Sequence, residues 1–388
     1  MLRSTVLSDS TLFRVAVIGA GSIGREFSLH HFGQQTRTRV VSVIDQDLEA
    51  AERLAADIGA VQSGAGVSGR ACKASVADAK GEPVPYATSF TTDLLGNCDM
   101  VYIGVPPSSH KDLVLTALSA GKHVLLEKPL ASSAADADAI VAATEAAEVC
   151  GVFVGVNIGM RWNAALQKMR HLLQEESALH HARLSLHFVR WPRDWQQVAW
   201  CTQRADGGPW RECGTHYLFA LQELGLVARR VKAEIAYADG PDGNAAEISI
   251  EGVIECACGL RVELSVKTDG TGLASDGDDH YELEVVCESG MVLQLQDFVQ
   301  LRRSPPGGKR RWKQLVTGGD YGRLESIKSL VDDISDSYHG EKKPPSKPHK
   351  PPSKPPRITV REARCTQRVN DAVLSSNGEW VDVNYETD

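Results

Sequence analysis

Several features that would place this chain in other classes of protein are scarce or missing. Its 388 residues contain no apolar run close to the ~18 residues that a membrane-spanning helix needs. The formal net charge is -8, so the chain lacks the basic balance of a nonspecific nucleic-acid binder. With 42% hydrophobic and 24% charged residues, it is typical of a globular protein of two or three domains that binds neither membrane nor nucleic acid.

Cysteine is present without the organisation of a disulfide or zinc site. The nine cysteines are scattered, odd in number and contain no CxxC pair. Cys256 and Cys258 are two apart, so on a strand they would share one face and could not easily bridge. We therefore expect reduced thiols in a reducing, cytoplasmic compartment and no metal site.

The first ordered stretch, FRVAVIGAGSIGREF, predicts a nucleotide-binding turn. Residues 13–18 are a short apolar, β-branched run, as expected of a buried parallel strand. The glycines of a GxGxxG motif follow, at Gly19, Gly21 and Gly24. In this motif the first permits a tight turn, the second lets the backbone approach a pyrophosphate and the third allows helix and strand to pack. The amides of Ser22 and Ile23 would then face the phosphate charge.

An acidic residue at the end of the next strand favours one cofactor over its phosphorylated form. The run RVVSVID ends in Asp45, 21 residues after Gly24, which matches the dinucleotide-binding pattern. A carboxylate here accepts hydrogen bonds from the ribose hydroxyls and repels a 2′-phosphate. No Arg or Lys is adjacent to neutralise such a phosphate. We expect NAD as the cofactor, with NADP as the alternative.

Two further strands are predicted to end at the same edge of this sheet. CDMVYIGVPPSSH and KHVLLEKPL each contain a short apolar core followed by a proline-containing turn. Ligands bind outside the carboxyl ends of parallel strands. The candidates for the cofactor site at these ends are Val105, Pro106, His110, Glu127 and Lys128.

The segment GGPWRECGTHYLFALQELG, residues 207–225, predicts one helix that carries a Glu–His pair. Pro209 suits a helix start and Gly225 a helix stop. Glu212 and His216 are four apart, so they would be neighbours on the helix, off its apolar stripe. Such a pair either faces water or orients an imidazole for general-base catalysis.

The motifs GAGSIG, IGVPPSSH, LLEKPL and GGPWRECGTH, in that order, resemble the Gfo/Idh/MocA oxidoreductases. The final stretch EARCTQRVNDAVLSSNGEWVDV is also similar to the usual ending of that family. The resemblance implies an α/β fold with a Rossmann domain and a second, α+β domain on a large, open, mostly antiparallel sheet. It also implies catalysis by an EKP lysine and by the histidine of a D-x-G-x-H segment, here Lys128 and His216. Glu212 stands where the family usually has Asp, so its role departs from the pattern.

The resemblance also implies the domain organisation and the assembly. We expect a Rossmann domain over residues 1–158 and a substrate and oligomerisation domain over 159–388. Asn157 and Arg161 lie at the crossing, where the family often places cofactor-facing and substrate-facing groups. Relatives tend to pair through the second domain's sheet, so a homodimer or homotetramer is expected.

Alternating strands support the second domain. Residues 183–188 and 260–267 alternate apolar with polar side chains, and similar runs lie near 231–237, 247–255, 281–287 and 291–301. One apolar face per strand predicts an antiparallel sheet covered by helices on one side. Five of the seven tryptophans lie between Trp162 and Trp210, where they would either stack on sugar rings or pack in the core.

Three segments are expected to lie outside the two cores. Residues 61–86 are small, polar and glycine-rich, typical of a surface-loop insertion. Residues 341–357 contain seven of the 17 prolines, which favours an extended solvated loop, with a docking site for a protein partner as the alternative. Residues 1–11 weakly resemble a transit peptide, but a strand is expected from near Leu12, so we interpret them as a frayed terminus.

Together the motifs and the resemblance predict an NAD-dependent dehydrogenase that acts on a secondary alcohol of a sugar, cyclitol or related diol. The residues expected to face the substrate are Lys128, Arg161, Trp162, Trp200, Glu212 and His216. Two alternatives share the fold: a redox-neutral glycosidase that recycles its NAD, and a nicotinamide-sensing regulator. The presence of Lys128 and His216 favours an enzyme, because such regulators can dispense with both.

Overall fold

The computed structural model describes residues 12–63, 84–90, 92–176, 178–240, 242–268, 278–307, 309–338 and 356–385. The chain divides into two compact units, each assembled from separate stretches. The first unit comprises Met1–Glu127, Ala139–Asn157 and Leu324–Val360, and the second comprises Lys128–Asp138, Ile158–Arg323 and Arg361–Asp388. The prediction placed everything after residue 158 in the second domain, whereas the described residues 324–338 and 356–360 cluster with the first unit. The N-terminal segment and most of the predicted 61–86 insertion and 341–357 loop lie outside the described residues.

A six-stranded parallel sheet forms the first unit. Its order is β3-β2-β1-β4-β5-β6. The strands are β1 (Phe13–Ile18), β2 (Thr38–Ile44), β3 (Tyr86–Ala87), β4 (Met100–Ile103), β5 (His123–Glu127) and β6 (Val154–Asn157). Every residue of β4, β5 and β6 is buried, so both faces of this part of the sheet are covered.

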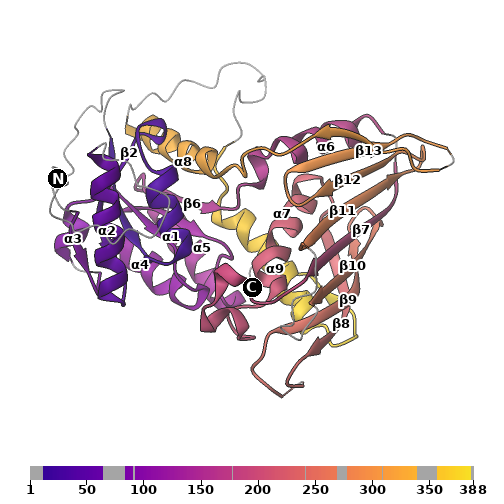
Figure 1. The fold of residues 1–388 in the computed structure, drawn as a ribbon, viewed down its shortest axis with the longest axis horizontal. Helices are drawn as coiled ribbons and strands as arrows, with labels where there is room; N and C mark the ends of the chain where they lie inside the picture. Colours follow the sequence, from indigo (N-terminus) through magenta and orange to yellow (C-terminus); the bar gives the residue numbers. More distant parts are fainter. Residues whose placement is uncertain are drawn as a thin grey trace. The chain divides into compact units, whose positions relative to one another are not determined.

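Helices cover this sheet, as Figure 1 shows. They are α1 (Ser22–Glu26), which continues as a π-helical turn η1 (Phe27–His31), α2 (Leu48–Gln62), α3 (Thr92–Gly96), α4 (His110–Ser119), α5 (Ala134–Glu148) and α8 (Arg323–Tyr338). Short 3₁₀ turns η2 (Gln34–Thr36) and η4 (Pro107–Ser109) lie between them. Leu330 and Ile334 of α8 belong to the same hydrophobic cluster as Val15 of β1 and Leu54 of α2. A helix more than 300 residues along the chain therefore completes the first unit's core.

The second unit is built on a nine-stranded sheet with the order β14-β13-β12-β11-β7-β10-β9-β8-β15. Its pairs are antiparallel apart from β7 and β10, which are parallel. The strands are β7 (Leu179–Phe188), β8 (Ala228–Tyr237), β9 (Glu247–Cys256), β10 (Arg261–Thr268), β11 (His280–Cys287), β12 (Val292–Gln296), β13 (Gln300–Ser304), β14 (Lys313–Val316) and β15 (Val381–Asp382). The run predicted near 291–301 is two strands, because Asp297 and Phe298 turn the chain with φ of 46° and 67°.

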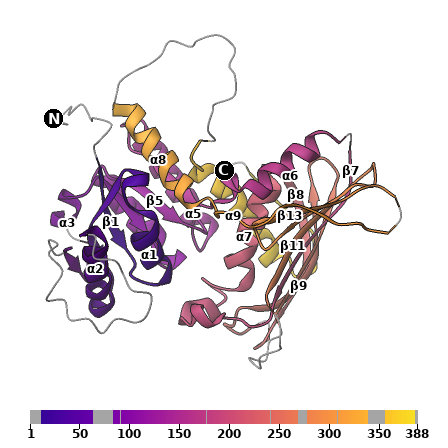
Figure 2. The same ribbon diagram turned by 45° about the horizontal axis from the view of Figure 1, so that its top comes forward.

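Helices lie against one face of this sheet (Figures 1 and 2). They are α6 (Ala164–Gln174), α7 (Thr215–Glu223) and α9 (Val360–Ser375). Short helical turns are η5 (Met160–Trp162), η6 (Asp194–Gln196), η7 (Ala199–Thr202) and the π-helical η8 (Trp210–Gly214). Ala182, Leu184 and Leu186 of β7 are buried at alternate positions, as the period-two pattern predicted.

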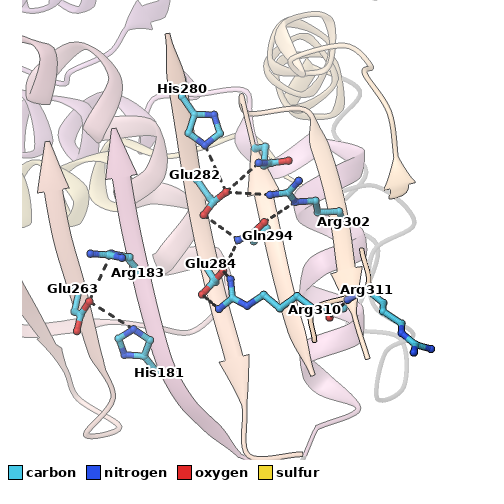
Figure 3. A network of polar contacts seen from close by, with 12 residues as sticks. His181, Arg183, Glu263, His280, Glu282, Glu284, Gln294, Arg302, Arg310 and Arg311 are labelled. Atoms are coloured by element: carbon cyan, nitrogen blue, oxygen red, sulfur yellow. Dashed lines mark hydrogen bonds and ion pairs between the residues drawn. The ribbon is translucent and has the colours of Figure 1, made fainter. Parts of the chain in front are cut away.

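Polar side chains on the second sheet are paired across its strands (Figure 3). The two terminal guanidinium nitrogens of Arg310, Nη1 and Nη2, donate to the carboxylate of Glu284, at 2.7 and 2.8 Å. Gln294 donates to Glu282 at 3.0 Å, and Arg302 donates to Gln294 at 2.6 Å. These charges are therefore balanced within one chain, and the expected homo-oligomer stays a prediction.

Candidate functional site

The glycine loop after β1 is shaped by contacts that only glycine permits. Gly19 has φ of 103°, and a Cβ there would lie 2.2 Å from the carbonyl oxygen of Gly104. A Cβ on Gly24 would lie 1.8 Å from the carbonyl oxygen of Gly19. A Cβ on Gly21 would meet nothing within 4 Å. Gly19 and Gly24 thus close the turn. Gly21 leaves open space beside the backbone amides that begin α1.

Asp45 lies directly against this loop. Its Oδ2 accepts a hydrogen bond from the amide of Ala20 at 2.6 Å, and its Oδ1 accepts one from Asp47 at 2.9 Å. Each carboxylate oxygen has a second lone pair, so both can accept a further hydroxyl. The acid predicted 21 residues after Gly24 is therefore beside the loop, as a dinucleotide site requires.

The ends of β4, β5 and β6 carry a buried hydrogen-bonded triad. The Tyr102 hydroxyl donates to Glu127 Oε1 at 2.9 Å, and Asn157 Nδ2 donates to the same oxygen at 2.6 Å. Burial, followed by the neighbouring Glu127 charge, holds the pKa of Tyr102 well above its usual range. Asn157 Oδ1 is buried without a hydrogen-bond partner among the described residues, so it can still accept a hydrogen bond from a ligand.

In the turn after β4, His110 supports the backbone of the turn, a role that was not predicted from the sequence. His110 is completely buried, and its Nε2 lies 2.9 Å from the carbonyl oxygen of Val105. Pro106 precedes a 3₁₀ turn that leads into α4. His110 was predicted to contact the cofactor, but its ring holds the turn closed, while Val105 and Pro106 remain partly exposed.

In the second unit, Lys128 and Glu212 form a buried ion pair. Lys128 Nζ donates to the carboxylate Oε2 and to the main-chain carbonyl of Glu212, each at 3.1 Å. Only 15% of the lysine side chain and 9% of the glutamate side chain are exposed. Gln196 Nε2 donates to the same Oε2 at 3.2 Å. The sequence placed Lys128 and Glu212 84 residues apart and did not predict that they touch, nor that Gln196 supports them.

His216 lies at the start of α7 with its imidazole buried. Its ring packs edge-on against Phe298 and Tyr321, with centroids 5.5 and 5.2 Å away. Burial, and then the positive charges of Lys128 and Arg193, hold the pKa of His216 well below its usual range. The imidazole is therefore neutral at neutral pH and able to accept a proton. Its Nδ1 is buried and has no hydrogen-bond partner within the described ranges.

The predicted Glu212–His216 contact is wrong. Glu212 is bonded to Lys128 and Gln196, and no hydrogen bond joins it to His216 among the described residues. Residues 210–214 form a π-helical turn instead of the expected α-helical one. Glu212 lies in this π-helical turn and His216 in α7, which follows it, so the two residues do not belong to the single regular α-helix that the predicted contact assumed. Both side chains are buried, so the pair does not face water.

Sequence analysis did not predict a role for Arg193. Its guanidinium carbon lies 5.3–5.8 Å from the ring centroids of four aromatic residues, Phe188, Trp191, Trp195 and Tyr281. Arg193 donates to the Cys213 thiol at 2.5 Å and pairs with Asp279 at 3.3 Å. The run RWPRDW, in which arginine and tryptophan alternate, is the pattern that could have indicated this aromatic cage.

Arg161, another predicted substrate residue, is paired with carboxylates of the second unit. Arg161 is 8% exposed and forms ion pairs with two carboxylates, Glu223 at 2.7 Å and Glu362 at 2.5 Å. It links α7 to α9, because a buried guanidinium needs paired acceptors. Trp162 and Trp200 stay predictions as residues that face the substrate.

No cluster of three or more His, Cys, Asp or Glu that could hold a metal occurs in the described part of the chain. The eight cysteines that the structure describes are free thiols. No helix within the described ranges is long and apolar enough to cross a membrane. The Lys128–Pro129 peptide bond is cis.

Comparison with known proteins agrees with this architecture. Residues 13–156 match the Gfo/Idh/MocA family model, described as an oxidoreductase family with an NAD-binding Rossmann fold. The chain is 36% identical over 163 residues to 1,5-anhydro-D-fructose reductase of Ensifer adhaerens, covering 42% of this chain and 41% of that protein. It is 34% identical over 131 residues to inositol 2-dehydrogenase 1 of Saccharopolyspora erythraea, covering 33% and 32%. The matches span about half or less of the first curated relatives.

Solved structures extend the likeness in fold to nearly the whole chain. Levoglucosan dehydrogenase in complex with NADH aligns with a TM-score of 0.70 over 96% of this chain and 100% of that one, at 16% identity. An oxidoreductase domain protein from Kribbella flavida aligns with a TM-score of 0.71 at 18% identity. At these identities the likeness shows the fold, a Rossmann sheet followed by a large, mostly antiparallel sheet.

Proposed function

Since this chain belongs to the Gfo/Idh/MocA oxidoreductases, we propose that it is an NAD-dependent dehydrogenase acting on a secondary alcohol of a sugar, cyclitol or related diol. The observation that carries this proposal is the neutral, buried His216, whose pKa is lowered by burial and by the charge of Lys128. Oxidation of an alcohol needs a proton acceptor and a positive group at the same oxygen. The names of relatives, among them an inositol dehydrogenase and an anhydrofructose reductase, support polyol-like substrates.

The glycine loop has the features that NAD requires. The open space at Gly21 would admit the pyrophosphate, with the amides of Ser22 and Ile23 facing its charge. Asp45 would accept the ribose hydroxyls, and Asn157 Oδ1 would accept a hydrogen bond from a polar group of the nicotinamide half. When bound, the nicotinamide supplies the hydride acceptor for the alcohol carbon. We favour NAD over NADP because Asp45 would repel a 2′-phosphate.

Within the second unit, the proposed roles follow from charge and protonation. Lys128 Nζ hydrogen-bonds the reacting oxygen and stabilises the negative charge that develops when its proton leaves. Burial and the neighbouring cations keep the imidazole of His216 unprotonated beforehand, so a ring nitrogen has a free lone pair for that proton. Glu212 fixes the position of the Lys128 amine through its carboxylate and carbonyl. Glu212 thus acts on the lysine, not on the histidine.

A panel of aldoses, aldonates, inositols and vicinal diols tests the proposal, with NADH fluorescence as the readout in both directions. We expect NADH formation with at least one cyclic polyol, at a rate lower by about two to four orders of magnitude in a His216→Asn variant. Tight NAD binding without NADH formation from any substrate would favour a regulator. Release of an aglycone from a glycoside without net NADH would instead favour the redox-neutral glycosidase.

A further inference from the structure

We propose that Glu247 is a positioning residue, which fixes the start of the helical segment that carries Glu212 and His216 and thereby sets their geometry. This inference rests on the proposed function of the same cluster. Glu247 is the first residue of β9, and only 2% of it is exposed. Its Oε1 accepts a hydrogen bond from the main-chain amide of Trp210 at 2.7 Å.

The contact gives a main-chain amide at the start of a helical turn a hydrogen-bond acceptor from a strand that is distant in the sequence. Trp210 follows Pro209 at the beginning of η8, where main-chain amides have no acceptor within the helix. A carboxylate at this end is stabilised by the amide and by the helix dipole. The capping group comes from 37 residues further along the chain, so no local capping pattern in the sequence reveals it.

Gly208 gives independent evidence that the backbone is built around this carboxylate. Its φ is 104°, in the left-handed region that favours glycine. A Cβ on Gly208 would lie 2.4 Å from Oε2 and 2.7 Å from Oε1 of Glu247. The glycine before Pro209 therefore leaves the space that the carboxyl group of Glu247 occupies.

The capped amide is mechanically linked to the catalytic side chains. The amide of Glu212 donates to the carbonyl of Gly208 at 3.0 Å, so Glu212 lies one hydrogen bond from the capped turn. Trp210 is fully buried, and its indole occupies the place that a Cβ on Gly214 would need, 2.3 Å from Cε3. A shift of the Trp210 main chain would therefore move the whole π-turn, and His216 follows Gly214 by two residues.

Glu247 is also able to change charge near neutral pH. Burial raises its pKa to about 7, while the Trp210 amide and then the cations Arg211 and Arg204 act in the opposite direction. Arg204 stacks on the ring of Tyr237 at 3.5 Å, and the guanidinium of Arg211 donates to the carbonyl of Arg204. The ionised carboxylate is the stronger acceptor, so the cap tightens as pH rises through about 7.

The contribution of Glu247 to the free energy of unfolding changes with pH in the opposite direction to the strength of the cap. Because the pKa of Glu247 is raised from 4.5 in the folded state, its contribution to stability is fully present below pH 4.5 and is lost as pH rises through about 7. The ionised form of Glu247 therefore holds the turn more firmly, while the protein is less stable than it is when Glu247 is protonated.

The test replaces the carboxyl group by an uncharged group of the same shape. Glu247→Gln keeps an oxygen that can accept from Trp210 but does not titrate. With the substrate that the panel identifies, we expect the parent's kcat to show a limb near pH 7 that is absent in Glu247→Gln. At pH 8 we expect kcat to be about threefold to tenfold lower in the variant, with KM unchanged, because a neutral acceptor is weaker than a charged one. Glu251→Gln, an exposed carboxylate on the same strand, is the matched control.

A second measurement separates this inference from the proposed function. With ¹⁵N-tryptophan labelling, the Trp210 amide resonance, assigned from Trp210→Phe, should titrate near pH 7 in the parent and stay constant in Glu247→Gln. This readout needs no substrate, so it stands even if every candidate alcohol is inert. A resonance that does not titrate, or a limb near pH 7 that survives in Glu247→Gln, would overturn the proposal, whereas a limb at lower pH belongs to His216. A titrating amide combined with identical pH–rate profiles would leave Glu247 a structural cap, which also overturns it.

Discussion

The glycine loop of the first unit and the charged cluster of the second unit are held together in different ways. From Gly19 to Gly24 the backbone itself makes the contacts, and the missing Cβ atoms allow them. Around Lys128 the contacts are between side chains of Lys128, Gln196 and Glu212, which come from three separate segments. The loop therefore depends on shape, whereas the cluster depends on charge held in a poorly hydrated interior.

This difference predicts how each region fails. An added methyl group should disrupt the loop at any pH, because a steric clash does not titrate. Removal of one charged group should disturb the cluster through the pKa values of its neighbours, because buried charges are weakly screened. The four predictions below test this contrast, from the largest expected effect to the smallest.

Replacement of His216 by Asn is expected to have the largest effect on turnover. The amide keeps a polar group of similar size but cannot take a proton, so kcat should fall by about two to four orders of magnitude. NAD affinity should be unchanged, because the glycine loop is intact. Calorimetry and NADH fluorescence measure the two quantities separately. Turnover equal to that of the parent would mean that the base lies elsewhere.

Replacement of Lys128 by Met should lower kcat by about a hundredfold to a thousandfold, the usual cost of losing one group that stabilises a developing oxyanion. It should also raise the pKa of His216, because a positive neighbour that disfavours the imidazolium is gone. The acidic limb that belongs to His216 should therefore move to higher pH. Nitrogen NMR of the imidazole checks the direction, and Lys128→Arg, which keeps the charge, should leave that pKa low. An unmoved pKa in Lys128→Met would assign the depression to burial and Arg193, without a contribution from Lys128.

The two regions also differ in how far the sequence predicted them. Gly19, Gly24 and Asp45 were predicted from spacing alone, because a local backbone rule fixes their arrangement. Lys128 and His216 were identified by resemblance, but the partner assigned to His216 was wrong. A π-turn is not visible in a periodicity that assumes 3.6 residues per turn.

Features that depend on distant packing were missed. Helix α8 has an ordinary amphipathic pattern, which shows that one face is buried but not that it joins the hydrophobic cluster that contains residues of β1 and α2. Arg161 was expected to face the substrate, and its buried pairing with Glu223 and Glu362 depends on two helices far along the chain. Charge pairs between distant segments leave no periodic trace in a single sequence.

A pair of glycine variants separates shape from binding in the loop. Gly24→Ala places its methyl carbon against the Gly19 carbonyl, so we expect a loss of about 1–3 kcal/mol in the free energy of unfolding, together with weaker NAD binding. Gly21→Ala meets no neighbour, so thermal unfolding should match the parent. Its NAD affinity should nevertheless fall about tenfold, or 1.4 kcal/mol, because the methyl group occupies the space proposed for the pyrophosphate. Parent-like affinity in Gly21→Ala would move the pyrophosphate away from this loop.

The smallest expected effect is a change of cofactor preference at Asp45. The parent should bind NAD more tightly than NADP, because the carboxylate repels a 2′-phosphate while it accepts the ribose hydroxyls. Asp45→Asn removes the charge and keeps an oxygen for the Ala20 amide, so the loop should stay folded. Asp45→Ser shortens the side chain and should lose that support as well.

We expect the ratio of the two dissociation constants to narrow by about threefold to tenfold in Asp45→Asn, at most about 1.4 kcal/mol. High salt should reduce the difference between NAD and NADP affinity more in the parent than in Asp45→Asn, because screening acts only where the charge remains. Titration of both cofactors by tryptophan fluorescence measures these ratios. A tenfold preference of the parent for NADP would contradict the assignment, and an unchanged ratio in Asp45→Asn would show that shape, not charge, selects the cofactor in this loop.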